Sequence, residues 1–362
     1  MFVHSALKKC SKLLFFIYSY AISNEIENSC SIKFKTMTDS ALSQLKKLTT
    51  IVADSSDLSA IEQFRPLDAT TNPSLITAAA SQENSRELIE AAYDQAKAEG
   101  LTHDALIERT IDILTVKFGV EILKLIEGRV STEVDASLSY NTEATIAKAK
   151  ELLALYAGYG VDQNRILIKI ASTWEGIQAA KALEAEGIHC NLTLLFGLHQ
   201  AQACADAQVT LISPFVGRIL DWYKKAENVD HYPIDKDPGV LSVKAIFDYY
   251  KSHGVKTEVM GASFRSTAQV LALAGCDLLT VAPNLLAQLQ EDPSNVEAQL
   301  IAAPSSHETA PELLEHDFKT ALERDLMASQ LLQAGIDGFI KARDQLNTLL
   351  RQSFGENAEL KL

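Results

Sequence analysis

Eight short apolar segments rich in β-branched residues alternate with helical patterns through most of this 362-residue chain. The helical patterns place apolar residues three and four positions apart, as in 142–156, 173–186, 200–207 and 266–274. Eight strands alternating with helices in one chain of this size predict an α/β fold, a single (β/α)8 TIM-type barrel with additional N- and C-terminal helices. The predicted strands span 51–54, 67–72, 129–135, 166–171, 190–196, 211–216, 258–264 and 278–283.

An open, doubly wound sheet is the alternative fold. Such a sheet normally carries a glycine-rich phosphate loop after its first strand, and neither GxGxxG nor GxxxxGK[ST] occurs in the chain. The polar segment 291–312 contains three prolines and is predicted to be a surface connection before a last helical region at 315–350. Since no linker or internal repeat interrupts the pattern, residues 37–362 are expected to form one barrel domain.

The first 36 residues differ from the rest. Three lysines, Lys8, Lys9 and Lys12, precede the apolar run 13–22, an order typical of a signal peptide, but no A-x-A cleavage site follows and the run is too short to span a bilayer as a helix. The segment could be a cleaved targeting sequence, a disordered extension, or an untranslated stretch upstream of a start at Met37. The last two interpretations are favoured, because the sequon at Asn191 falls in a predicted strand where a glycan could not fit. A cytoplasmic protein is therefore predicted.

Charge and cysteine content exclude several classes of function. The chain has 33 basic and 47 acidic residues, for a net charge of −14, so no nucleic-acid or membrane partner is expected. The five cysteines form no CxxC pair, which favours free thiols in a reducing compartment.

A lysine lies in the middle of the apolar strand 166–171. Strand alternation puts Lys169 on the face opposite three isoleucines, so in a barrel it points to the interior. Burial disfavours the charged ammonium and so favours a nucleophilic amine, although a structural pairing with a carboxylate explains a buried lysine equally well.

Other predicted strands carry polar residues on one face. Polar side chains that converge inside a barrel are unfavourable unless they form a site, because this interior is normally filled by branched apolar residues. By alternation these residues are Asp54 on the first strand, Asp68, Thr70 and Asn72 on the second, Ser131, Glu133 and Asp135 on the third, and Asn191 and Thr193, together with Leu195, on the fifth.

Two arginines follow successive strands. Arg218 and Arg265 each lie just after the carboxyl end of a predicted strand, where barrel active sites are built, and a guanidinium suits phosphate. The eight histidines include no HxH or HExxH pair and GxSxG is missing, so neither a zinc site nor a serine hydrolase is indicated.

Six long motifs, in order along the chain, resemble transaldolase of the class I aldolase superfamily. The resemblance extends from about residue 38 to near the C-terminus. The motifs are DATTNPSLI at 68–76, GRVSTEVDASLSYNTEATIAKA at 128–149, RILIKIASTWEGI at 165–177, CNLTLLF at 190–196, LISPFVGRILDWYKK at 211–225 and VMGASFR at 259–265.

This resemblance implies a cofactor-free and metal-free transfer of a dihydroxyacetone unit between sugar phosphates. It assigns Lys169 as the Schiff-base nucleophile, Asp54 as the base that deprotonates the C4 hydroxyl, and Glu133 and Thr193 as the pair that moves protons through a water. The residues implied to bind substrate are Asn72, Asn191, Ser213 and Phe215 around the dihydroxyacetone unit, and Arg218, Ser263 and Arg265 at the phosphate.

Two alternative functions remain, an aldolase and an inactive sugar-phosphate binder. A fructose 6-phosphate aldolase would share this barrel but carries a tyrosine where this chain has Phe215, so the phenylalanine favours a transferase. A catalytically inactive sugar-phosphate binder is disfavoured by the intact Lys169, Asp54 and Glu133. Where the family usually has Ser-Phe-Ala, this chain has Gly197-Leu198-His199, which could open the site wall or add a proton donor. By analogy with the family, a homodimer is possible.

Overall fold

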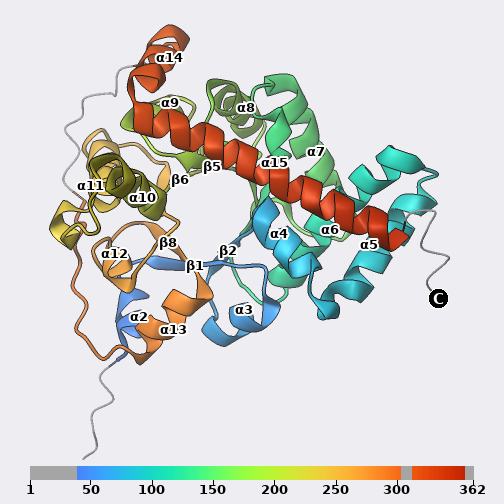
Figure 1. Cartoon of the computed structure of the whole chain (residues 1–362), viewed down its shortest axis with the longest axis horizontal. Helices are drawn as coiled ribbons and strands as arrows, with labels where there is room; N and C mark the ends of the chain where they lie inside the picture. Colours follow the sequence, from blue (N-terminus) through green and yellow to red (C-terminus); the bar gives the residue numbers. More distant parts are fainter. Residues whose placement is uncertain (1–38, 303–311, 355–362) are drawn as a thin grey trace, which may run out of the picture. The chain divides into compact units, whose positions relative to one another are not determined.

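The computed structural model describes residues 39–302 and 312–354, which contain a closed barrel of eight parallel strands (Figure 1). Each strand pairs with the next in chain order, and β8 pairs with β1 with Thr50 opposite Leu278. All eight predicted strands are confirmed, most of them a few residues shorter than predicted. They are β1 Thr50–Asp54, β2 Asp68–Thr70, β3 Val130–Glu133, β4 Ile166–Ala171, β5 Cys190–Leu195, β6 Leu211–Pro214, β7 Glu258–Gly261 and β8 Leu278–Val281.

Helices follow every strand, as expected for a (β/α)8 barrel. The helices that come directly after the strands are α3 Leu58–Phe64, α4 Pro73–Ala80, α7 Thr142–Gly158, α8 Trp174–Ala185, α9 Leu198–Asp206, α10 Val216–Glu227, α12 Thr267–Leu271 and α13 Pro283–Glu291. The additional helices are α2 Ala41–Leu45 before β1, α5 Arg86–Ala98 and α6 His103–Leu123 before β3, α11 Pro238–Ser252 before β7, and α14 Glu315–Arg324 and α15 Leu326–Phe354 at the end.

Polar side chains set the starts and breaks of several helices. Asn141 and Thr173 cap α7 and α8 by accepting hydrogen bonds from Ala144 N at 3.0 Å and Gly176 N at 2.9 Å. The predicted helical region 315–350 is divided at Asp325, whose Oδ1 accepts from Ala328 N at 3.0 Å and starts the second helix.

The barrel interior below the site is apolar. The isoleucines of β4 pack outward in the main core, as predicted, and Leu167 points inward. This inner layer consists of Val52, Leu167, Leu211, Met260 and Leu278. This layer fills the barrel on its amino-terminal side, so a site inside the barrel must lie at the carboxyl ends of the strands.

The predicted alternation of β5 is wrong beyond Thr193. Leu194 has φ +54°, and the pairing of β5 with β6 shifts register between Leu192 and Leu195. This irregularity turns Leu194 to the apolar cluster at the barrel mouth with Phe196, whereas Leu195 packs in the outer core. An extra residue in the ladder reverses the side-chain order, so simple alternation fails there.

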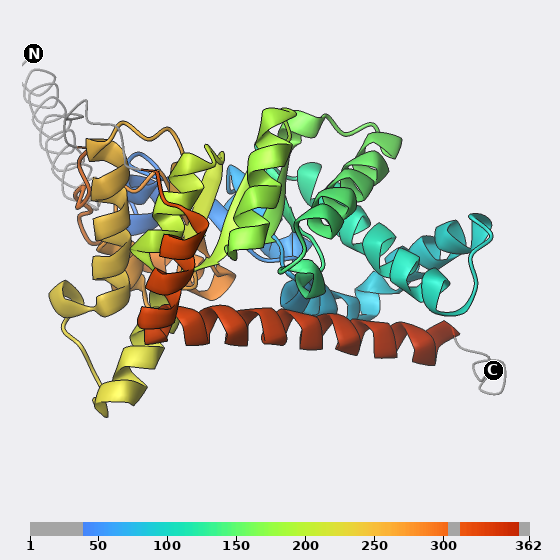
Figure 2. The ribbon, with the colours of Figure 1, turned by 90° about the horizontal axis from the view of Figure 1, so that it is seen from above.

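The C-terminal helix α15 lies along one side of the barrel as a single long element (Figures 1 and 2). It contacts α4, α6, α10 and β5, which come from separate parts of the chain. Since residues of α15 share an apolar cluster with Leu194 and Phe196 at the carboxyl end of β5, α15 covers part of the barrel mouth.

The extension 1–36, with its apolar run, and part of the connection 291–312 lie outside the described residues. Within residues 39–302 and 312–354, no helix has the length and apolar content needed to cross a membrane.

Candidate active site

A cavity of about 80 Å³ at the carboxyl ends of the strands gathers most of the predicted site residues. A second cavity, of about 30 Å³, lies beside it and shares Asn72. The eight predicted residues that line the first cavity are Asp54, Asn72, Lys169, Thr193, Ser213, Phe215, Arg218 and Ser263. The other three, Glu133, Asn191 and Arg265, contact members of this set through hydrogen bonds or an ion pair.

Lys169 and Glu133 form a buried pair on adjacent strands. They are directly opposite each other in the β3–β4 register, and Lys169 Nζ lies 3.3 Å from Glu133 Oε2. The ammonium also donates a hydrogen bond to the Thr71 carbonyl oxygen at 3.1 Å. Burial raises the pKa of Glu133 to about 7, against the opposing effect of the Lys169 charge. Glu133 can therefore both accept and donate a proton near neutral pH.

Asp54 ends β1 on the other side of the cavity. Its Oδ1 accepts a hydrogen bond from Thr70 Oγ1 at 3.2 Å, and Thr70 Oγ1 lies 2.8 Å from Thr280 Oγ1. Burial raises the pKa of Asp54, while Lys169 and Arg218 act to lower it. A desolvated carboxylate in this position is a stronger base than one in water.

The polar residues of β5 and β6 form a fixed chain of hydrogen bonds. Ser213 Oγ donates to Asn191 Oδ1 at 2.6 Å, and Asn191 Nδ2 donates to Ser131 Oγ at 3.0 Å. Thr193 is fully buried, and its hydroxyl has no hydrogen-bond partner among the described residues. A buried hydroxyl without a partner is unfavourable unless a bound water or substrate satisfies it.

Arg218 supplies a half-buried positive charge. Its Cζ lies 5.1 Å from the centre of the Phe215 ring, and in the described part of the chain its guanidinium makes no hydrogen bond or ion pair. Burial, followed by the charge of Arg265, lowers the pKa of Arg218. Helix α10 begins at Val216, so the positive end of its dipole also favours an anion nearby, while Val216 N and Gly217 N themselves donate to the carbonyls of Ala262 and Ser263 at 2.8 Å.

Arg265 is more exposed and already paired. Its Nε and Nη2 both lie 2.9 Å from Asp221 Oδ2, and its Nη1 donates to Ser263 Oγ at 3.3 Å. Ser263 has φ +61°, an uncommon conformation for a residue with a side chain and one that occurs at functional sites.

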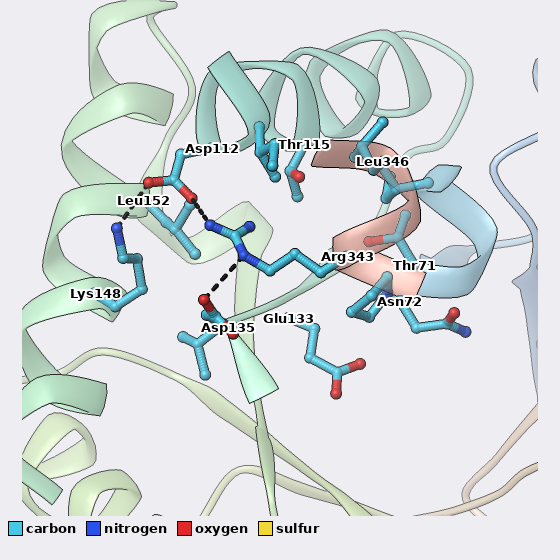
Figure 3. A pocket seen from close by; sticks show the side chains of 14 residues that line it. Thr71, Asn72, Asp112, Thr115, Glu133, Asp135, Lys148, Leu152, Arg343 and Leu346 are labelled. Atoms are coloured by element: carbon cyan, nitrogen blue, oxygen red, sulfur yellow. Dashed lines mark hydrogen bonds and ion pairs between the residues drawn. The ribbon is translucent and has the colours of Figure 1, made fainter. Parts of the chain in front are cut away.

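Asn72 connects the two cavities. Its Oδ1 accepts from Leu75 N at 3.0 Å as the N-cap of α4, which leaves its NH2 group for a ligand. Figure 3 shows Asn72 and Glu133 on the wall of the second cavity, together with Arg343.

Two acids that share predicted faces with site residues have other partners. Asp68 accepts from Arg129 N at 2.8 Å and pairs with the Arg129 side chain at the amino-terminal end of the barrel. Asp135 pairs with Arg343 Nε at 2.9 Å. Both carboxylates are therefore neutralised by structural ion pairs.

His199 does not line the site cavity. Its ring packs edge-on against Phe318 of α14, with 5.7 Å between ring centres, and burial lowers its pKa. A Cβ at Gly197 would lie 2.3 Å from His199 Cε1, so glycine at this position makes room for the imidazole. Gly197 and His199 thus form part of the contact of α9 with α14, and Phe196 packs against Phe215.

Among the residues that line this cavity, sequence reasoning missed Met260, Ala262, Thr280 and, on α15, Phe339. Its ring centre lies 5.8 Å from Arg218 Cζ. Because Phe339 is one of several apolar residues on an amphipathic helix, nothing in the sequence separates it from ordinary core residues.

Comparisons with known proteins agree with this geometry. A family model described as Transaldolase/Fructose-6-phosphate aldolase matches residues 51–350. A curated transaldolase of Nostoc sp. is 54% identical over 323 residues, which cover 87% of this chain and 97% of that protein. Transaldolases of Prochlorococcus marinus and Methylococcus capsulatus are both 52% identical, over 89% and 87% of this chain and 99% and 97% of their own lengths.

Proposed function

Because this chain belongs to the transaldolase/fructose-6-phosphate aldolase family, we propose that it is a transaldolase of the non-oxidative pentose phosphate pathway. It transfers a dihydroxyacetone unit from sedoheptulose 7-phosphate to glyceraldehyde 3-phosphate, giving erythrose 4-phosphate and fructose 6-phosphate. The observation that supports this best is the buried Lys169–Glu133 pair, which faces an unpaired Arg218 across one cavity.

The first steps join the donor ketose to the enzyme. The neutral amine of Lys169 attacks the C2 carbonyl, and the carbinolamine loses its hydroxyl as water to leave a protonated Schiff base. Glu133 supplies the proton for this departing hydroxyl, with Thr193 holding the water that carries it. Asn72, Asn191 and Ser213 bind the hydroxyls of the dihydroxyacetone unit.

Carbon–carbon cleavage follows from the position of Asp54. Its carboxylate removes the proton of the C4 hydroxyl, the C3–C4 bond breaks, and the bonding electrons pass into the protonated Schiff base to give an enamine. The aldose phosphate leaves, and the reverse steps join the enamine to the acceptor. Arg218 and Arg265 hold the phosphate and thereby fix the reacting carbons at the lysine.

Transfer rather than simple aldol cleavage requires that the enamine is not protonated by water or a nearby acid before the acceptor arrives. Phe215 helps to keep the enamine from being protonated, because its ring is 7% exposed and offers no proton donor to the cavity. An aldolase that releases free dihydroxyacetone is the second candidate, distinguished by activity without an acceptor.

Borohydride trapping with fructose 6-phosphate tests the proposal. We expect reduction to attach a three-carbon unit to Lys169, mapped by peptide mass, with the same yield in the presence of EDTA. Addition of erythrose 4-phosphate before the borohydride should then remove the adduct by transfer. A folded protein with unmodified Lys169 would contradict the Schiff-base mechanism.

The raised pKa of Glu133 predicts a pH dependence. Below about pH 7, Glu133 takes up a proton and can no longer accept one from Lys169, 3.3 Å away. We therefore expect kcat/KM to fall about tenfold per unit as pH drops below 7. In Glu133→Gln this acid limb should disappear from the profile, together with most of the activity. An unphosphorylated donor provides the control, since substrate phosphate itself titrates near pH 6.

A cytoplasmic location and a homodimer complete the proposal. The cysteines of the described residues, Cys190, Cys204 and Cys276, are all buried and free, which is typical of proteins kept in a reducing compartment. The sequon residue Asn191 is fully buried in β5, where glycosylation would disrupt the barrel. Light scattering of the purified protein would give its oligomeric state.

A further inference from the structure

Helix α15 presents a stripe of residues to the barrel mouth at a spacing of four. Gly335, Phe339 and Arg343 follow this spacing, so they lie on one face of the helix. At Gly335 the helix is very close to the site: a Cβ there would lie 2.5 Å from Leu194 Cδ2 and 3.3 Å from Arg218 Nη1. The absence of a side chain at Gly335 therefore lets α15 approach the phosphate-binding arginine directly.

Phe339 is placed one turn farther along, on the cavity wall itself. It is 3% exposed, and its ring centre lies 5.8 Å from Arg218 Cζ. Phe215 contacts the same guanidinium from β6, at 5.1 Å. Two aromatic rings from distant parts of the sequence thus contact a guanidinium that makes no direct ion pair in the described part of the chain.

This arrangement leaves the hydrogen-bonding capacity of Arg218 for a ligand. A carboxylate partner would compete with a substrate phosphate, as Asp221 does at Arg265. Aromatic rings attract the cation through their faces but accept none of its in-plane N–H groups. The rings can therefore orient the guanidinium while its donors remain available to phosphate oxygens.

Arg343 fixes the helix in this position. Its guanidinium contacts Asp135 after β3 at 2.9 Å, and Asp112 lies 3.6 Å away and also pairs with Lys148 (Figure 3). It also contacts Glu108 of α6 at 2.6 Å. One residue earlier, the Ala342 carbonyl accepts from Thr77 Oγ1 of α4 at 2.8 Å. These contacts lie one turn from Phe339, so they hold its ring against Arg218.

We propose that Phe339 is a specificity-determining residue, which orients Arg218 and so sets the preference of this enzyme for phosphorylated over unphosphorylated sugars. The inference rests on the proposed transaldolase function. It extends the site beyond the barrel strands to the C-terminal helix, which is fixed by an ion-pair cluster outside the substrate cavity.

The test compares two acceptors, erythrose 4-phosphate and D-erythrose, at saturating fructose 6-phosphate, so that transfer gives sedoheptulose 7-phosphate or sedoheptulose and releases glyceraldehyde 3-phosphate. In Phe339→Leu we expect the ratio of their kcat/KM values to fall roughly 3- to 30-fold, the range of a lost cation–π contact. The inhibition constant of inorganic phosphate should rise by a similar factor, and Phe339→Tyr should restore both values. Phe247→Leu, which truncates an equally buried phenylalanine on α11, should leave the ratio unchanged.

Equal losses of kcat/KM for both acceptors in Phe339→Leu would show that the ring only packs the cavity wall. Wild-type kcat/KM values for both acceptors would show that Arg218 needs no support from α15. Either result overturns the inference. Failure of the proposed function is distinguishable, because the wild-type protein would then transfer to neither acceptor and Lys169 would not be trapped.

Discussion

Lys169→Met is expected to lower the transfer rate roughly 10⁴-fold or more, because no other group can form the Schiff base. Methionine keeps a long unbranched chain in the same space, so the loss should come from the missing amine rather than from a cavity. Without the Lys169 charge, which acts to lower the pKa of Glu133, this buried carboxyl should stay protonated at neutral pH and need no counter-ion. We therefore expect a folded barrel with circular dichroism like that of the wild type and no adduct after borohydride treatment.

Lys124→Met is the matched control for this variant. Lys124 is exposed at the end of α6 and, among residues 39–302 and 312–354, pairs only with Glu121, so its replacement should leave both rate and trapping unchanged. Activity above about one per cent in Lys169→Met would contradict the mechanism, since residual rates after loss of a covalent nucleophile are far smaller.

The barrel and its lysine could be predicted because both follow from short-range periodicity. The period of two in β4 separates Lys169 from three isoleucines, and the structure places those isoleucines in the outer core and the lysine in the cavity. Glu133 could be predicted for the same reason, and parallel pairing then puts it opposite Lys169. The pairing of β3 with β4 thus brings Glu133 and Lys169, which are each predicted from their own strand, into one ion pair.

Other features depend on interactions that no local pattern contains. The turn of Leu194 out of alternation comes from the register shift between β5 and β6, which depends on how two strands pair. Phe339 reaches the site because distant residues hold α15, chiefly Asp135 and Glu108 through Arg343. The role of Gly197 as space for His199 likewise appears only when α9 meets α14.

Asp54→Asn is expected to separate Schiff-base formation from carbon–carbon cleavage. The amide keeps the shape of the side chain and can still accept from Thr70, but it cannot remove the proton of the C4 hydroxyl. Cleavage should therefore slow by about 10²- to 10⁴-fold, the usual contribution of a general base. Schiff-base formation depends on Lys169 and Glu133 and should continue. Borohydride should then trap the whole six-carbon sugar phosphate on Lys169, in place of the three-carbon unit found in the wild type.

The mass of this adduct decides the role of Asp54 independently of the rate. Asp57→Asn is the matched control, because Asp57 is exposed, caps α3 and can be replaced by asparagine in that role. This control should yield the three-carbon adduct, as the wild type does. A three-carbon adduct formed at a normal rate in Asp54→Asn would assign the base to another group, and Glu133 would be the one to test next because it is the other carboxyl beside the lysine.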